Sequence, residues 1–340
     1  MVVQVTRWVR AIAGAYARPL VLGAAAGGAV VATLSFPLAL WFRLFELVNF
    51  FRPEVFGIAL LAFAVTFPFA DRTHRMLMAA MVMANLLLVV APAALFTHGH
   101  SGGRCATASA EGDSGGLHLL SLNLLDDNPR YEKVIDLMRA ERPDVIVLQE
   151  LSEQWRMPLA ALNEEWPYQA GKEVGNRALV VFSRWPLGPA ADLVSYRAPR
   201  KKTQALVLPL RAPRGPVTLV AIHATSPRDD GLWATRNAMF TELAALLGGG
   251  RSRTVALGDW NTARWSPVFQ WFMIRTALRE AEARLLPPST RFFAGFGLGT
   301  LLGSPVDHVA ASDDMEITCF RLGPRVGSDH LPLVAEVRLR

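Results

Sequence analysis

The chain predicts an α/β fold with mixed sheets, preceded by an apolar helical region. From Leu117 onward, short apolar segments alternate with amphipathic helical ones. The later apolar segments follow one another closely, which favours mixed sheets over a simple parallel sheet. The first 96 residues instead contain three long apolar runs.

These runs predict three transmembrane helices, at about 20–42, 50–70 and 76–96. The first and third carry no charge, and about 20 apolar residues suffice to cross a bilayer. The second is interrupted near its start by Arg52-Pro53-Glu54, which we place at the membrane interface. A cleaved signal peptide is the alternative for the first run.

The distribution of arginine predicts the orientation. Arg7, Arg10 and Arg18 precede the first run, and the short loop 71–75 is basic again. Because basic loops stay in the cytoplasm, we expect a cytoplasmic N-terminus. The chain beyond residue 97 is then expected outside the cytoplasm.

The net charge of +6 belongs mainly to the apolar region. Eight arginines and three acids in the first 105 residues account for +5 of it. The pI near 9.8 therefore reflects arginines that flank the membrane and does not indicate a nucleic-acid-binding domain. Residues 197–202 form a local basic segment, interpreted as a solvated loop.

Residues 97–116 predict a linker between the two regions. They are rich in Gly, Ser and Ala, and we interpret His98 and His100 within them as solvated. The predicted domains are thus a membrane region at 1–96, the linker, and a soluble domain at 117–340. Cys105 and Cys319 both fall on the outer side, where a disulfide is permitted but not required by their spacing.

Within the soluble domain, short apolar segments predict the strands and amphipathic segments predict the helices. The expected strands are 117–122, 144–149, 178–182, 205–210, 217–222, 254–257, 306–310, 316–322 and 333–339. The expected helices are 130–142, 152–165, 229–247 and 267–283.

Polar residues follow or begin several of these strands. The strand 254–257 leads into Gly258-Asp259-Trp260-Asn261, and in an extended backbone residues i and i+2 point the same way. We therefore expect Asp259 and Asn261 to converge, where they could hold a water molecule beside an anionic oxygen. The other such positions are Asn123, Glu150, His223, Asp307, Asp329 and His330. Each one is compatible with an ordinary turn. Six such ends, which carry acids, amides and histidines and almost no basic side chain, together favour one shared site.

Three motifs, in their order along the chain, resemble the endonuclease/exonuclease/phosphatase superfamily with its DNase I-like fold. They are Leu148-Gln149-Glu150, Gly258-Asp259-Trp260-Asn261 and Gly327-Ser328-Asp329-His330. The resemblance covers about 117–340 and implies a four-layer sandwich, two packed sheets with helices outside and a site at one end of the sheets. With three apolar runs ahead of it, the chain is similar to a membrane-anchored bacterial subgroup of YafD-type proteins. That similarity implies a multi-pass protein of the bacterial inner membrane with a periplasmic or extracellular catalytic domain.

The sequence departs from the family pattern at two positions. Trp260 stands where Phe is more usual, which we expect to change only packing. His223 is followed by Ala224-Thr225-Ser226 rather than the usual Thr-His-Leu-like run, which makes its assignment less secure.

The resemblance also implies the chemistry, which is phosphodiester hydrolysis by an activated water with Mg²⁺, or Mn²⁺ in its place. Glu150 is expected as a metal ligand, with Asn123 beside it and Asp329 completing the set. Asp259 would orient or deprotonate the water, and Asn261 would hold that water or a phosphate oxygen. His330, oriented by Asp307, would contact the phosphoryl group from one side and His223 from the other. The neighbouring His308 is expected to be structural.

The substrate remains open between lipid and nucleic acid. The membrane region favours a lipid. An apolar, glycine-rich loop at 291–302 either enters the bilayer or accepts an acyl chain, which would also favour a lipid, or packs on the sheet as a buried loop. The near-neutral soluble domain gives no support to nucleic acid. A non-catalytic sensor and a transporter are the other function classes; the transporter is weaker because the charge-free spans offer no ion pathway. No obligate protein partner is expected.

Overall fold

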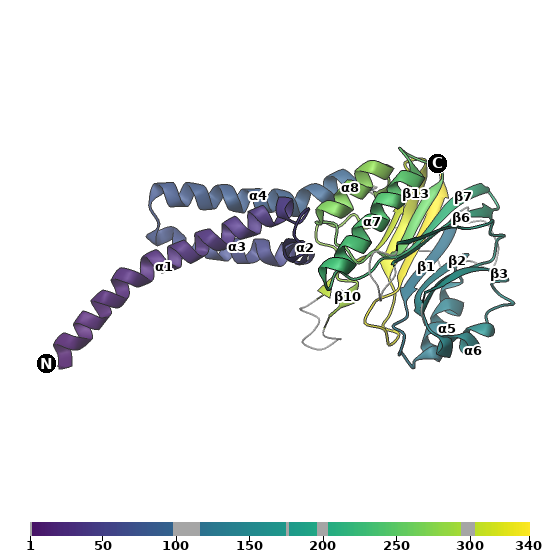
Figure 1. Cartoon of the computed structure of the whole chain (residues 1–340), viewed down its shortest axis with the longest axis horizontal. Helices are drawn as coiled ribbons and strands as arrows, with labels where there is room; N and C mark the ends of the chain where they lie inside the picture. The colour runs from purple at the N-terminus through teal and green to yellow at the C-terminus, as the bar shows by residue number, and fades with distance from the viewer. Residues whose placement is uncertain (1, 98–115, 175–176, 196–202, 294–302) are drawn as a thin grey trace. The chain divides into compact units, whose positions relative to one another are not determined.

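A computed structural model describes residues 2–97, 116–174, 177–195, 203–293 and 303–340 (Figure 1). The chain forms two compact units, which we describe separately. The helical unit is Met1–Pro92 together with Trp265–Pro267, and the sheet unit is Ala93–Arg264 together with Val268–Arg340.

The helical unit contains α1 (Val2–Leu38), α2 (Arg43–Phe50), α3 (Arg52–Thr66), a 3₁₀ turn η1 (Phe67–Phe69) and most of α4 (Arg72–Phe96). Three stretches are long and apolar enough to cross a membrane: Pro19–Leu38, Arg52–Phe69 and Arg72–Phe96. The first ends before the expected residue 42 because the chain turns after Leu38 and then forms the short helix α2.

Arg52 is wholly buried within this unit. Its guanidinium donates to the carbonyl oxygen of Ala32 at 2.6 Å, to Asn85 Oδ1 at 3.1 Å and to Ser35 Oγ at 2.8 Å. Asn49 Oδ1 accepts a further hydrogen bond. These neutral oxygens come from α1, α2 and α4, and they take the place of water around the buried charge.

Two six-stranded mixed sheets form the sheet unit. The first has the order β13–β14–β1–β2–β4–β3, and the second β5–β6–β7–β8–β12–β9. The pairs β1/β2 and β7/β8 are parallel, and the other pairs are antiparallel. The strands of the first sheet are β1 (Leu117–Asn123), β2 (Val145–Leu151), β3 (Tyr168–Val174), β4 (Arg177–Ser183), β13 (Met315–Leu322) and β14 (Leu333–Leu339). Those of the second are β5 (Ala191–Ser195), β6 (Thr203–Ala212), β7 (Gly215–His223), β8 (Thr254–Asp259), β9 (Arg279–Glu280) and β12 (Asp307–Ala311). A separate pair joins β10 (Arg291–Phe292) to β11 (Gly303–Ser304).

The sheets and helices stack in four layers, which confirms the predicted fold class. Helices α5 (Tyr131–Glu141) and α6 (Arg156–Ala160) lie outside the first sheet, and α7 (Asp230–Leu247) and α8 (Pro267–Thr276) outside the second (Figure 1). Strand residues alternate between layers, so that Leu119 lies in the core between the sheets and Leu120 in the core beneath α5 and α6. In the second sheet, Leu257 faces the inter-sheet core and Ala256 lies beneath α7 and α8.

The helix predicted at 152–165 is wrong for most of its length. Only a 3₁₀ turn η2 (Glu153–Trp155) and the short α6 form, followed by turns. Trp166 is fully buried and donates from Nε1 to the carbonyl oxygen of Pro143 at 2.7 Å. This anchor fixes the chain beside the first sheet, where a continuing helix would not reach.

The helix predicted at 267–283 is also too long. It ends at Thr276 because Ala277 adopts a left-handed φ of 52°. Glu280 then pairs with strand β12. Its carboxylate oxygens lie 2.8 Å from His308 Nδ1 and 2.8 Å from Arg264 Nη2. Tertiary partners therefore override the helical pattern here. The pattern also misses β3 and β5, which are edge strands without an apolar run.

Several expectations fall on residues outside the described ones. These are His98, His100 and Cys105 of the linker, the basic segment 197–202 and residues 294–302 of the apolar loop. Cys319 is described; it is buried on β13 and disulfide-bonded.

Candidate active site

Three pairs of polar side chains join the two sheets at one end of the sandwich. Asn123 ends β1 and Asp259 ends β8. Asn123 Nδ2 donates a hydrogen bond of 3.0 Å to Asp259 Oδ2. His330, just before β14, contacts Asp307 at the start of β12, and Glu150 of β2 lies near His223 of β7. The predicted residues of the strand ends thus lie together.

Asp259 and Asn261 converge as predicted, but for a different reason. Asn261 is not extended; its φ is +46°, so the chain turns immediately after β8. The turn lets the backbone N–H of Asn261 donate to Asp259 Oδ1 at 2.9 Å and its side-chain amide to Oδ2 at 2.8 Å. The amide also donates to the carbonyl oxygen of Ala224 at 2.8 Å, which fixes its orientation.

Gly258 allows β8 to reach this position. Its φ is +139°, and a Cβ there would lie 2.0 Å from the carbonyl oxygen of Ile222. Only glycine permits this approach of β8 to β7. The register that results sets His223 opposite Asp259.

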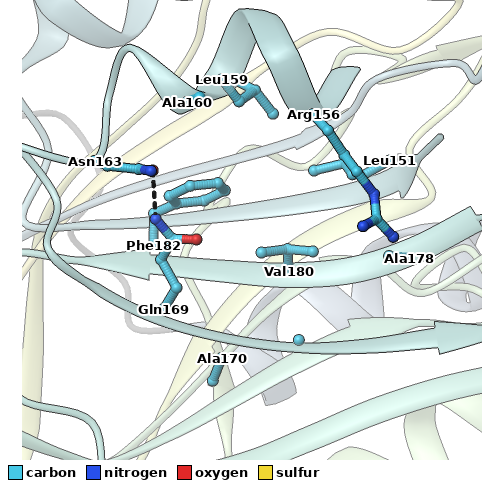
Figure 2. Close-up of a pocket in the computed structure, with 11 residues that line it drawn as sticks. Leu151, Arg156, Leu159, Ala160, Asn163, Gln169, Ala170, Ala178, Val180 and Phe182 are labelled. Carbon is cyan, nitrogen blue, oxygen red and sulfur yellow. Dashed lines mark hydrogen bonds between the residues drawn. The ribbon is translucent and has the colours of Figure 1, made fainter. Parts of the chain in front are cut away.

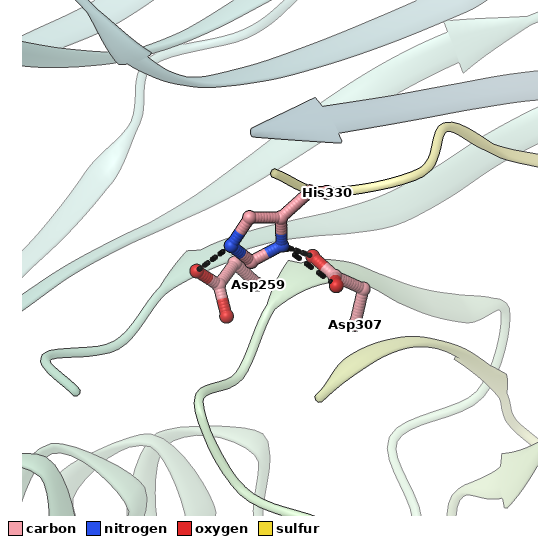
Figure 3. Close-up of side chains that lie close together, drawn as sticks. All are labelled: Asp259, Asp307 and His330. Carbon is pink, nitrogen blue, oxygen red and sulfur yellow. Dashed lines mark hydrogen bonds and ion pairs between the residues drawn. The ribbon is translucent and has the colours of Figure 1, made fainter. Parts of the chain in front are cut away.

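His330 lies between two buried carboxylates (Figure 3). Its Nδ1 is 2.9 Å from Asp307 Oδ2, and its Nε2 is 3.8 Å from Asp259 Oδ2. Thr290 Oγ1 donates to Asp307 Oδ2 at 2.6 Å and holds that carboxylate in place. Burial alone lowers the pKa of His330, but the charges of Asp307 and Asp259 outweigh burial and raise the pKa to about 9. The ring is therefore an imidazolium near neutral pH.

The carboxyl group of Asp259 has a raised pKa. Burial raises its pKa above the ordinary value, the charge of Asp307 raises it further, and the nearby cationic side chains, led by His330, offset only part of the rise. A carboxylate of this kind suits accepting a proton from water.

Glu150 is directed into the site by an irregularity in β2. The pairing of β2 with β4 shifts between Leu148 and Leu151, and Glu150 has a left-handed φ of 56°. Its Oε2 is 2.7 Å from Arg177 Nη1, and its Oε1 is 3.7 Å from His223 Nε2. Burial acts to raise the pKa of Glu150, but His223 and Arg177 outweigh it and hold that pKa far below its usual range. The side chain is thus an ionised oxygen donor.

Two groups of residues could hold a divalent metal. Asp259, Asp307 and His330 offer ligand atoms within 4.8 Å of one another. In that group, His330 Nδ1 already contacts Asp307 at 2.9 Å. Glu150 is an ionised oxygen donor and better fits a hard cation that prefers oxygen ligands. Asn123 lies on the neighbouring strand β1, and its amide oxygen accepts a hydrogen bond from the N–H of Leu125 at 3.1 Å. Asp329, the third predicted ligand, is one-quarter exposed, and its Oδ1 lies 4.0 Å from His330 Nε2.

Two arginines at the site are not predicted by the sequence pattern. Arg177 pairs with both Glu150 and Asp126. Arg291 Nη1 donates to Asn261 Oδ1 at 2.9 Å, its Nε is 3.5 Å from Asp329 Oδ2, and its guanidinium stacks over Phe293. Arg291 begins a two-residue strand, too short to carry a periodic signal, and Arg177 precedes its apolar run.

His308 is buried and lies away from the catalytic groups. Its ring nitrogens contact Glu280 Oε1 and the carbonyl oxygen of Thr262, both at 2.8 Å. Trp260 is buried among Phe240, Phe269 and Phe272, which gives it a packing role as expected.

A cavity of about 380 Å³ lies on the outer face of the first sheet, between α6 and strands β3 and β4 (Figure 2). Its walls are mainly apolar, and Gln169 Nε2 donates to Asn163 Oδ1 at 2.7 Å at one side. None of the side chains predicted for catalysis lines this cavity.

Comparisons with known proteins agree with this architecture. A model of the Endonuclease/Exonuclease/phosphatase family matches residues 110–330. An endonuclease/exonuclease/phosphatase from Beutenbergia cavernae DSM 12333 is similar in structure, with a TM-score of 0.53 and 18% identity over 66% of this chain and 72% of that one. The human Nocturnin catalytic domain with bound sulfate gives a TM-score of 0.54 at 16% identity, over 66% and 95% of the two chains. TDP2 of D. rerio, complexed with a single-strand DNA product, gives 0.55 at 12% identity, over 66% and 99%. No curated protein matches the chain by sequence.

Proposed function

The chain belongs to the endonuclease/exonuclease/phosphatase family, and on this basis we propose that it is a membrane-anchored, divalent-metal-dependent phosphoesterase. The reaction is hydrolysis of a phosphodiester by an activated water. The observation that carries the proposal is the placement of Asp259, a buried carboxylate of raised pKa, within hydrogen-bonding distance of Asn123 and Asn261 and beside the imidazolium of His330.

Asp259 accepts the proton of the attacking water. A bond forms between the water oxygen and phosphorus, and the bond from phosphorus to the leaving oxygen breaks. The two amides of Asn123 and Asn261 fix the orientation of the carboxylate, so that it need not reorganise during the reaction.

Positive groups stabilise the phosphoryl oxygens. His330 presents Nε2, and Asp307 holds the ring through Nδ1. Arg291 is only 11% exposed at its side chain, and its Nε has no hydrogen-bond partner among the described residues. A substrate oxygen would satisfy this N–H, because buried donors are rarely left unpaired. His223 contacts the phosphoryl group from the side of Glu150.

Glu150 and Asn123 would hold the metal, with Asp329 completing the set. Mg²⁺, or Mn²⁺ in its place, would supply positive charge that neutralises the phosphoryl oxygens. Arg177 already supplies a positive charge to Glu150. Its pairing with Asp126 lets it turn away from Glu150 without losing an acidic partner.

We place the catalytic domain on the extracytoplasmic side of a bacterial inner membrane, in the manner of YafD-type proteins. Three apolar helices of sufficient length support the anchoring. The basic residues before the first helix and between the second and third support the orientation. The disulfide at Cys319 supports an oxidising compartment.

The test uses the full chain in detergent with bis-p-nitrophenyl phosphate. We expect hydrolysis with Mg²⁺ or Mn²⁺, its loss on chelation and its recovery when the metal is restored. In ¹⁸O-labelled water, the label should enter the p-nitrophenyl phosphate, since the water attacks phosphorus. Metal binding without hydrolysis would contradict the proposal and favour a non-catalytic sensor.

A further inference from the structure

We propose that the substrate is a lipid of the surrounding membrane, hydrolysed at its phosphodiester. This inference rests on the proposed function and names its substrate class. It comes from the short path between the catalytic groups and the apolar helices, and from apolar side chains exposed beside the site.

The end of the third apolar helix is built into the sheet unit. Phe96 is buried in the core beneath α7 and α8. Thr97 forms a bridge with Glu280 of β9, and Arg279 donates to the carbonyl oxygen of Leu95. The residue at which the helix ends is thus fixed to an edge strand of the second sheet.

From that edge the catalytic groups are close. Glu280 pairs with Ala310, three residues along β12 from Asp307. At a rise of about 3.3 Å per residue, this distance along the strand is about 10 Å. Asp307 orients His330, so the phosphoryl-binding groups lie about one short strand from the end of an apolar helix.

Large apolar side chains are exposed along the segment that supplies two groups of the site. Leu285, Leu286 and Phe293 are 46%, 58% and 45% exposed. Between them lie Thr290, which holds Asp307, and Arg291, which contacts Asn261. These three exposed apolar side chains lie close together in the sequence, and exposed apolar patches mark surfaces that contact a protein, a ligand or a membrane. An arginine beside them suits a phosphate at the boundary of the apolar layer.

The charge of the chain argues against a nucleic acid as the substrate. Residues 106–340 contain 27 basic and 26 acidic side chains. A nucleic-acid surface draws its affinity from many unpaired cations. Of the two arginines at this site, Arg177 is already paired with the acids Asp126 and Glu150.

The experiment compares two substrates in one preparation. The full chain is reconstituted into vesicles of phosphatidylethanolamine, phosphatidylglycerol and cardiolipin, and release of products from these lipids is followed by mass spectrometry. Bis-p-nitrophenyl phosphate and plasmid DNA are assayed with the same vesicles. The wild type should hydrolyse a lipid and the soluble diester, but not DNA.

The variant is Leu285→Ser with Leu286→Ser, and the matched control is Met157→Ser, an exposed apolar residue of α6. We expect the double variant to lose at least fivefold on the lipid and to stay within twofold on the soluble diester. The control should be unchanged on both. Unchanged lipid hydrolysis in the double variant, or hydrolysis of the soluble diester or DNA without any lipid hydrolysis by the wild type, would overturn this inference alone. No hydrolysis of any substrate would overturn the proposed function.

Discussion

Asn261 donates two hydrogen bonds to the carboxylate of Asp259, from its backbone N–H at 2.9 Å and from its side-chain amide at 2.8 Å. The backbone adopts a left-handed φ of 46° to make both. Such conformations in non-glycine residues often mark functional sites. The turn fixes the orientation of the Asp259 carboxylate. Removing the Asn261 amide tests how much this orientation contributes to catalysis.

Asn261→Gly removes the amide and keeps the left-handed backbone accessible. We expect kcat on bis-p-nitrophenyl phosphate to fall by about 10²-fold, as for loss of one fixed donor at a reaction centre. Asn163→Gly, an exposed amide beside the outer cavity, is the control. Equal turnover by the two variants would show that the amide does not position Asp259.

Activity should fall on the alkaline side as His330 loses its proton, with a midpoint near the raised pKa of about 9. In Asp307→Asn the fall should move to lower pH, because one of the charges that raise the pKa is removed. A pH profile of kcat/KM from pH 6 to 10 measures both. An alkaline limb at the same pH in the variant would contradict this assignment.

The same pairing also makes stability depend on pH. The folded pKa of His330 lies above the ordinary value of 6.5, so its contribution is complete below about pH 6.5 and is lost as pH rises through about 9. The free energy of unfolding should therefore fall across this window in the wild type. The fall should be smaller in Asp307→Asn.

Glu150→Gln tests the metal site without relying on catalysis. Loss of the ionised oxygen should weaken Mn²⁺ binding by about 10-fold or more, measured by electron paramagnetic resonance of the free ion. Glu132→Gln, on the exposed side of α5, is the matched control. Unchanged Mn²⁺ affinity in Glu150→Gln would redirect the metal to the group of Asp259, Asp307 and His330.

Arg52→Met tests the polar cluster of the helical unit. The substitution leaves the amide oxygens of Asn85 and Asn49 without their arginine donor, at a cost of about 1–3 kcal/mol for each buried group left unpaired. The Ala32 carbonyl oxygen still accepts from Ser35 Oγ at 2.7 Å. Thermal unfolding of the full chain in detergent should show the loss, while Arg72→Met at the exposed start of α4 should have little effect. Equal midpoints in the two variants would mean that the cluster does not hold the helices together.

The sequence predicts most of the layered fold because apolar periodicity records which face of a strand or helix is buried. Leu119 and Leu120 show this alternation directly. It predicts poorly where a single distant contact decides the local structure. Trp166 ends the helix expected at 152–165 by reaching Pro143, and Glu280 forms a strand by pairing with β12.

The acids, amides and histidines of the site follow from strand ends and from the family resemblance. How closely these side chains approach one another depends on backbone conformations that the two-residue alternation of a strand does not predict. The left-handed residues Glu150 and Asn261 are examples. The role of Arg291 is not predicted, because its partner Asn261 lies 30 residues away in the sequence. No local pattern records such a contact.

The measurement that tests the account most directly is single-turnover hydrolysis by Asp259→Asn, with Mn²⁺ affinity measured on the same protein. The substitution keeps the shape and the hydrogen-bonding size of the side chain but removes its capacity to accept a proton. We predict a loss of about 10³-fold in rate with Mn²⁺ affinity within threefold of wild type, and no change in Asp136→Asn on the exposed face of α5. A rate for Asp259→Asn equal to that of the wild type would contradict the central role given to this carboxylate.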